Sequence, residues 1–226
     1  MIRRALRDNG LSLAFLALFL LALAGQAVAG YAQHAEEQSE HGLPVPSFGS
    51  FLLSADFAVD VAENWQSEFL QFLLFITATV WLVQRGSPES KKPGDEGLGD
   101  EEDQLIAHGA RPDSPRWARA GGWRTRLYGH SLALTMGAIF LLSWLAQSLA
   151  GVVVLNDENA AHGAPALSWA EYLASADFWN RTLQNWQSEL LAVGAMVAFS
   201  IFLRERGSAE SKPVGTPHHV SAEESE

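Results

Sequence analysis

One pentapeptide, Asn-Trp-Gln-Ser-Glu, occurs twice in this chain, at residues 64–68 and again 121 positions later at residues 185–189. Shifting the sequence on itself by 121 positions pairs residues 6–91 with residues 127–212 without a gap, and 33 of the 86 pairs are identical. An internal repeat has to be recognised before the length is interpreted. The 226-residue chain is therefore predicted to consist of two equivalent halves.

Composition excludes several kinds of site. The chain contains no cysteine, which rules out disulfides, thiolate metal ligands and thiol nucleophiles. Its net charge of −11 argues against a nucleic-acid partner, because phosphate recognition requires Lys and Arg concentrated on one face. The apolar residues are concentrated in four stretches, and the polar residues fill the segments between them.

The first and third apolar stretches are long enough to cross a membrane. Residues 11–30 carry no charge, and a helix rising about 1.5 Å per residue would span a hydrocarbon core of about 30 Å. Arginines before this stretch and small residues at its end also fit a cleaved signal peptide. Residues 132–155 repeat the pattern deep inside the chain, where no leader can be removed. Both are therefore expected to be retained membrane helices, at about residues 11–31 and 131–154.

The second and fourth stretches contain uncharged runs of only 15 and 14 residues, which alone could be core helices. A crossing requires about 20 residues, and counting back from the inner end of each run reaches the pentapeptide. Membrane helices are therefore expected at about residues 64–84 and 184–204, with the pentapeptides at the outer boundary. Each ends at Arg-Gly-Ser, where glycine suits a helix C-cap and arginine suits the cytoplasmic interface.

The basic residues predict the orientation. Of 15 Lys and Arg residues, only Arg181 lies between two paired helices, and the other 14 lie near the termini or around the central linker. By the positive-inside rule, both termini and the linker (residues 92–124, largely disordered) are cytoplasmic, as is the disordered tail (residues 213–226). The predicted location is the inner (cytoplasmic) membrane, with both repeats in the same orientation.

Each external segment is predicted to contain a short interfacial helix. After Ser47 and after Ser168, apolar residues follow at the spacing i, i+3, i+4, i+7 of one helix face. Residues 168–171 also fit a capping box. Asp56 and Asp177 then stand where the N-cap of the next helix is expected.

Polar side chains gather at the outer ends of the predicted membrane helices. The Asn and Glu of each pentapeptide are four residues apart and share a helix face. A glutamine at a similar depth in the preceding helix seeks a polar partner, and the simplest arrangement pairs each glutamine with the pentapeptide of its own repeat. The candidate residues are Gln26, Asn64, Trp65, Gln66, Glu68, Gln147, Asn185, Trp186, Gln187 and Glu189.

Two interpretations of this polar cluster stay open. An ionisable side chain inside the membrane boundary marks a candidate functional site. Alternatively, these groups cap and hydrogen-bond the helix hairpin, with the two tryptophans as interfacial anchors. The duplication does not separate the two interpretations, because packing and chemistry would both be copied.

Neither a metal site nor an enzyme is expected. His41 and His162 lie near acidic residues, but each loop offers too few ligands and no His-x-x-x-His spacing. The sequence has no Gly-x-Ser-x-Gly nucleophile context and no glycine-rich phosphate loop after a strand. No cofactor is therefore predicted.

Several further motifs occur beside the two pentapeptides: residues 6–13, the helix ends at residues 25–27 and 147–151, and Arg-Gly-Ser-x-Glu-Ser-Lys at residues 85–91 and 206–212. Together these motifs resemble an uncharacterised family of bacterial integral membrane proteins, known as a domain of unknown function. The resemblance covers both repeats and implies a membrane location, but it carries no activity and no functional residues.

The sequence thus predicts an all-α membrane protein with four transmembrane helices. Two helix hairpins of parallel orientation, repeat 1 (residues 1–91) and repeat 2 (residues 125–212), each carry a short external interfacial helix. The first expected function is non-enzymatic, acting through packing or partner binding in the lipid bilayer. The alternative is a conduit for a small solute or cation, for which a homo-oligomer would provide room.

Overall fold

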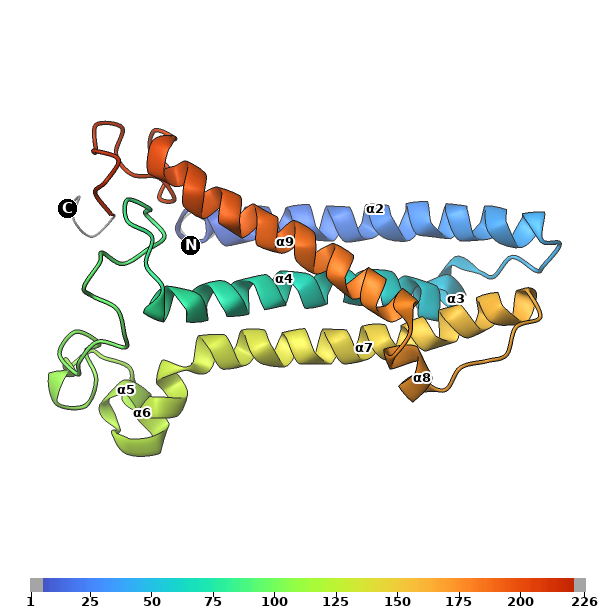
Figure 1. Ribbon diagram of the computed structural model, residues 1–226, viewed down its shortest axis with the longest axis horizontal. Helices are drawn as coiled ribbons and strands as arrows, with labels where there is room; N and C mark the ends of the chain where they lie inside the picture. Colours follow the sequence, from blue (N-terminus) through green and yellow to red (C-terminus); the bar gives the residue numbers. More distant parts are fainter. Residues whose placement is uncertain (1–5, 222–226) are drawn as a thin grey trace. The chain divides into compact units, whose positions relative to one another are not determined.

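The computed structural model describes residues 6–221, and every regular element in that range is helical, which confirms the predicted all-α class. Figure 1 shows four long helices: α2 (Gly10–Glu40), α4 (Ala55–Trp81), α7 (Ser131–Ala161) and α9 (Ala176–Phe202). The short elements are α3 (Phe48–Leu52), η1 (Ala107–Gly109), α5 (Arg116–Arg119), α6 (Gly122–Gly129) and α8 (Trp169–Leu173). The linker, predicted to be largely disordered, thus contains η1, α5 and the start of α6.

The helix bounds recur at the offset of the sequence repeat. Helices α2 and α7 each have 31 residues, α3 and α8 have 5, and α4 and α9 have 27, with each pair starting 121 residues apart. The turns recur as well: φ is 67° at Gly42 and 68° at Gly163, and 87° at both Gly86 and Gly207. Glycine adopts these positive angles without a steric penalty. The two halves of the sequence therefore encode the same local elements.

The short helices α3 and α8 begin where the sequence predicted. Ser47 and Ser168 are their N-caps, and each side chain accepts a hydrogen bond from the backbone N–H three residues later. In α8 the Glu171 carboxylate also accepts a hydrogen bond from the Ser168 N–H, at 2.7 Å. The predicted capping box is confirmed.

The predicted N-caps of the next long helices are wrong by two residues. The N-cap of α9 is Ser175, which accepts a hydrogen bond from Phe178 N at 3.2 Å, and Ser54 accepts the equivalent bond from Phe57 N at 3.3 Å. The serine hydroxyl reaches the exposed N–H of the first turn. The aspartates that follow lie inside that turn, where their charge favours the positive end of the helix dipole.

Within residues 6–221, only α2 and α7 are long and apolar enough to cross a membrane, so the prediction of four such helices is wrong by this measure of length and composition. The reason lies in α4 and α9 themselves. Each contains the polar pentapeptide well inside the helix, and each ends before the last apolar residues of its predicted span, at Trp81 and Phe202.

The chain forms two compact units, and each takes residues from both repeats. The first unit comprises Met1–Val61 and Leu149–Leu167, and the second comprises Ala62–Ser148 and Ser168–Glu226. In the first unit, the Tyr31 hydroxyl donates to the Pro46 carbonyl at 3.0 Å. The same ring packs edge-on against Phe48, which fixes α3 beside α2.

In the second unit, the chain after α9 turns back over the Arg-Gly-Ser turn that follows α4. Lys212 is only 3% exposed, and four backbone carbonyls lie within hydrogen-bond distance of the three N–H groups of its ammonium. The carbonyls belong to Gly86, Pro217, His218 and Val220. The repeat counterpart of Lys212, Lys91, also donates to a carbonyl of the following chain, that of Gly97, at 2.6 Å. In both repeats, the lysine of the Arg-Gly-Ser-x-Glu-Ser-Lys motif therefore hydrogen-bonds to the backbone that follows it.

Candidate functional site

The two pentapeptides meet in the second unit. The Trp186 indole N–H donates to the Gln66 side-chain carbonyl at 2.7 Å, and the Gln66 amide donates to the Glu63 backbone carbonyl at 3.1 Å. Gln66 is fully buried. Leaving a buried polar group unpaired costs about 1–3 kcal/mol, so these two bonds make the burial of Gln66 tolerable.

The serines of both pentapeptides bond within their own helices. Ser67 Oγ donates to the Asn64 carbonyl and Ser188 Oγ donates to the Asn185 carbonyl, each at 2.9 Å. The Asn185 side chain likewise donates to the Arg181 carbonyl at 2.9 Å. Such bonds back to the preceding turn satisfy a polar side chain without any partner on another helix.

The two copies differ in burial. Gln66 is buried, whereas its counterpart Gln187 is exposed. Glu68 is exposed and Glu189 is half-buried, and the two carboxylates are close enough to interact electrostatically. Like charges oppose one another, so the two glutamates do not hold the helices together.

An ionic network missed by the sequence prediction lies one turn before the pentapeptides. The Arg181 guanidinium is 3.4 Å from the carboxylates of both Glu63 and Asp177. The buried Tyr172 donates its hydroxyl to Asp177 at 3.1 Å. Burial opposes the charge of Arg181, but the two carboxylates outweigh it and raise the pKa of the guanidinium. The signal available in the sequence was that Arg181 is the only basic residue between paired helices.

The glutamines of the preceding helices lie in different units. Gln147 in the second unit is fully buried, and neither its side-chain oxygen nor its nitrogen has a hydrogen-bond partner within residues 6–221. Phe140, two turns earlier on the same face of α7, has its ring 6.3 Å from that of Trp186. Gln26 lies half-buried in the first unit. The pairing of each glutamine with the pentapeptide of its own repeat stays a prediction.

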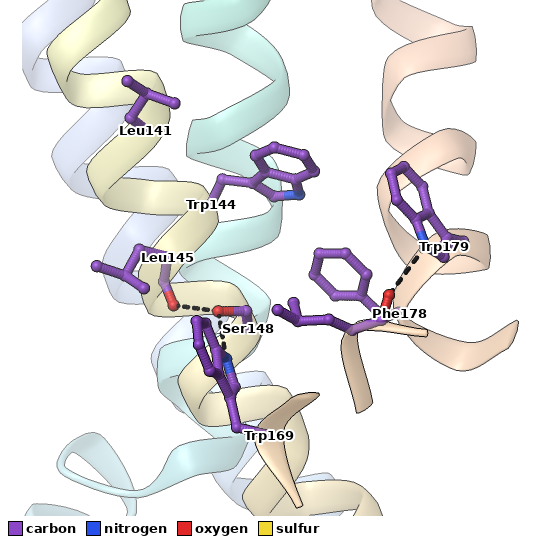
Figure 2. A pocket seen from close by; sticks show the side chains of 8 residues that line it. Leu141, Trp144, Leu145, Ser148, Trp169, Phe178 and Trp179 are labelled. Carbon is purple, nitrogen blue, oxygen red and sulfur yellow. Dashed lines mark hydrogen bonds between the residues drawn. The ribbon is translucent and has the colours of Figure 1, made fainter. Parts of the chain in front are cut away.

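A cavity of about 290 Å³ lies between α7, α8 and the start of α9, the helix that also carries Asp177 and Arg181 of the ionic network. Figure 2 shows Trp144, Leu145 and Ser148 projecting from α7, with Phe178 and Trp179 across from them. The sequence prediction missed this aromatic pocket. Its lining residues are Leu141, Trp144, Leu145, Ser148, Trp169, Leu173, Phe178 and Trp179.

Aromatic contacts hold the rings of the pocket in place. Trp144 stacks on Phe178 with 5.9 Å between ring centroids, and both rings meet Trp179 edge-on at 6.1 and 5.4 Å. Offset-stacked and edge-on pairs at these separations are favourable beyond the area they bury. The rings therefore form a fixed wall.

The described part of the chain contains no group of three or more His, Cys, Asp or Glu that could hold a metal ion. His41 and His162 lie just after α2 and α7, and each Nδ1 is 2.8 Å from the backbone carbonyl four residues earlier. Both rings thus satisfy carbonyls at helix C-termini.

No curated protein and no solved structure matches the chain. One family model does, and it extends from residue 2 to residue 223, over both repeats and the linker between them. This chain, with two pentapeptides joined through Trp186 and Gln66, therefore belongs to the family described as Domain of unknown function (DUF6766).

Proposed function

We propose that the protein is a non-enzymatic integral membrane protein in which the paired pentapeptides join the two repeats. The observation that carries the proposal is the hydrogen bond from Trp186 to the buried Gln66, because its partners come from different repeats. In a membrane helix, a polar side chain that bonds to a neighbouring helix favours association.

The membrane location is supported by the apolar surface of the long helices. Helices α2 and α7 are long and apolar enough to cross. Helices α4 and α9 have 27 residues each, about 40 Å at 1.5 Å per residue, which suffices for a return crossing. Their polar Gln66, Ser67 and Thr182 are buried, whereas large apolar residues such as Leu191 and Phe199 are exposed. This distribution favours insertion of α4 and α9 beside partner helices.

With return crossings by α4 and α9 included in the proposal, the distribution of Lys and Arg favours a multi-pass protein of the inner membrane, with cytoplasmic termini and linker. The non-enzymatic role is supported by the use of the pentapeptide side chains. Gln66, Ser67 and Ser188 all hydrogen-bond within the protein rather than into a cavity. These side chains therefore stabilise the helices and the contact between them.

The experiment compares two glutamines at the same place in the two pentapeptides. Gln66→Ala removes the acceptor of the Trp186 indole and should lower the free energy of unfolding in detergent by about 1–3 kcal/mol. Gln187→Ala is the matched control, because Gln187 is exposed, and it should change that value by less than about 0.5 kcal/mol. Equal effects of the two substitutions would remove the support for an inter-repeat role.

A second candidate, a cation conduit, is favoured by repeat counterparts that interact at two levels, one within α4 and α9 and one beyond their C-terminal ends. Glu68 interacts electrostatically with Glu189, and beyond the other helix ends Glu89 hydrogen-bonds to Glu210. Acidic groups at two levels could attract a cation along the helix pair. Four helices leave little room for a pore, so this function requires a homo-oligomer.

A further inference from the structure

We propose that the aromatic pocket of the second repeat binds a trimethylammonium group, supplied by a choline-type lipid headgroup or by a soluble choline-like cation. This binding goes beyond the joining of the repeats and uses other residues. A cation over the faces of tryptophan and other aromatic rings is attracted by the ring quadrupole, and aromatic cages recognise quaternary ammonium groups in this way.

The pocket wall offers rings but no unused indole donor. Trp144 donates its indole N–H to Thr182 Oγ1 at 3.2 Å, Trp169 donates to Ser148 Oγ at 3.1 Å, and Trp179 donates to the Leu173 carbonyl at 3.0 Å. Tryptophans that serve only as interfacial anchors keep one polar edge toward water or headgroups. These three direct it into the protein. Trp144 also stacks on Phe140 and Phe178, so the ring surface left for a ligand is mainly that of Trp169 and Trp179, which are 44% and 41% exposed.

The differences between the repeats single out this pocket. Trp144, Trp169 and Trp179 correspond to Leu23, Phe48 and Ala58 in the first repeat. Two hydrogen-bond acceptors change with them, because the first repeat has apolar residues where the second has Thr182 and Ser148. Their counterparts are Val61 and Ala27. Tryptophan and acceptor are thus present together in one repeat and absent together from the other, which a packing role common to both repeats does not explain.

The charges around the pocket favour a cation. Asp177 precedes the lining residue Phe178, and Glu171 lies between the lining residues Trp169 and Leu173. Hydrogen bonds from Ser168 lower the pKa of the Glu171 carboxyl and keep it ionised. Arg181, which lies in α9, is the only Lys or Arg in residues 131–203, and it already faces two carboxylates, those of Asp177 and Glu63. The carboxylates near the lining residues in sequence or paired with Arg181, those of Glu171, Asp177 and Glu63, therefore outnumber the single guanidinium.

The volume sets the size of the ligand. Pockets for drug-sized molecules measure roughly 300–1,000 Å³, so a cavity of about 290 Å³ fits one small group rather than an extended molecule. A trimethylammonium group is compact and cannot donate a hydrogen bond. It therefore suits a wall whose polar groups are already paired.

The test titrates choline into the full-length protein, in phosphatidylethanolamine nanodiscs, by isothermal calorimetry. The neutral control ligand is 3,3-dimethyl-1-butanol, which has the shape of choline without the charge. We expect choline to bind at least about tenfold more tightly, which corresponds to about 1.4 kcal/mol of cation–π attraction. Equal binding of both ligands would identify a purely apolar pocket, and absence of choline binding would also overturn the proposal.

The same titration in phosphatidylcholine nanodiscs identifies the source of the group. Weaker apparent binding of choline there means that the lipid headgroup competes for the pocket, whereas unchanged binding points to a soluble cation. Either result supports recognition of a trimethylammonium group, provided that choline binds more tightly than the neutral ligand.

Variants locate the site. Trp179→Ala recreates the alanine of the first repeat and should abolish choline binding, whereas Trp179→Phe keeps a ring and should retain most of it. Trp81→Ala removes an exposed tryptophan outside the pocket and should leave binding unchanged. Binding that survives Trp179→Ala, or is lost equally in Trp81→Ala, would contradict the assignment to this pocket. Thermal unfolding of each variant shows that it is folded.

Discussion

Trp186 and Gln66 hydrogen-bond to each other although they are not repeat counterparts: Trp186 corresponds to Trp65, and Gln66 corresponds to Gln187. The reciprocal glutamine, Gln187, is exposed. Two identical pentapeptides therefore perform different roles, one supplying the buried acceptor and the other the donor.

This asymmetry predicts unequal effects of one conservative substitution. Trp186→Phe keeps an aromatic ring but removes the N–H that Gln66 accepts, and it should lower the free energy of unfolding by about 1 kcal/mol. Trp65→Phe is the control at the equivalent position and should cost less. Denaturant unfolding of both variants in the same detergent measures the difference, and a larger cost for Trp65→Phe would be incompatible with the contact described.

The proposed topology predicts the labelling of introduced cysteines. The chain has no cysteine of its own, so single cysteines at Ser39 and Ser114 report without background. An impermeant maleimide added to intact cells should label the cysteine at position 39 and not the one at position 114. The reverse pattern would invert the topology, and labelling of both positions would show that the linker is external.

Removing the charges of Glu68 and Glu189 separates the two candidate functions. Because their carboxylates interact electrostatically and carry like charges, the double Glu→Gln variant should be at least as stable as the parent. A packing role predicts no change in cation flux in proteoliposomes. A flux that is present in the parent and lost in an equally stable variant would instead establish the conduit.

The contact between Glu89 and Glu210 predicts a dependence of stability on pH. Burial, followed by the hydrogen bond and the charge of Glu210, raises the pKa of Glu89 above its ordinary value of 4.5. A raised pKa in the folded state means that the contact contributes fully below about pH 4.5 and is lost as the pH rises through the raised value. Thermal unfolding between pH 4.5 and about 7.5 should show this decline.

The variant Glu210→Gln should flatten that decline, because the amide donates its hydrogen bond at every pH. Glu205→Gln, an exposed neighbour, is the control and should keep the slope of the parent. If Glu210→Gln keeps the slope as well, the pH dependence arises elsewhere.

Local structure was largely predictable, because it depends on short-range chemistry. Ser47 and Ser168 mark the starts of the short helices, and glycines mark turns with positive φ. The error at Asp56 and Asp177 arose because a serine and an aspartate two residues apart both suit an N-cap. Which of the two residues becomes the N-cap depends on where the preceding turn ends, and here it ends at the serine.

The contacts between elements were not predictable from the repeat. Identical pentapeptides carry no signal that Gln66 is buried and Gln187 is exposed, because that difference arises from the helices packed around them. Arg181 was visible as an isolated cation, but its distance from Glu63, 118 residues away, was not. The aromatic pocket could have been found by examining where the repeats differ, since tryptophans and acceptors change together.

The buried ammonium of Lys212 has a consequence for the synthesis of the protein. Lys and Arg orient a membrane protein while the chain is being inserted, before residues 213–221 have folded back. In the proposed topology, Lys212 is at that stage a free cation that would help to retain the end of the chain in the cytoplasm. Once the carbonyls of Pro217, His218 and Val220 surround it, the charge is withdrawn from solvent. In the proposed topology, one lysine would thus act first as an insertion signal and later as a structural contact. A chain ending at Pro213 would keep the signal and lose three of its four carbonyl acceptors, keeping only that of Gly86.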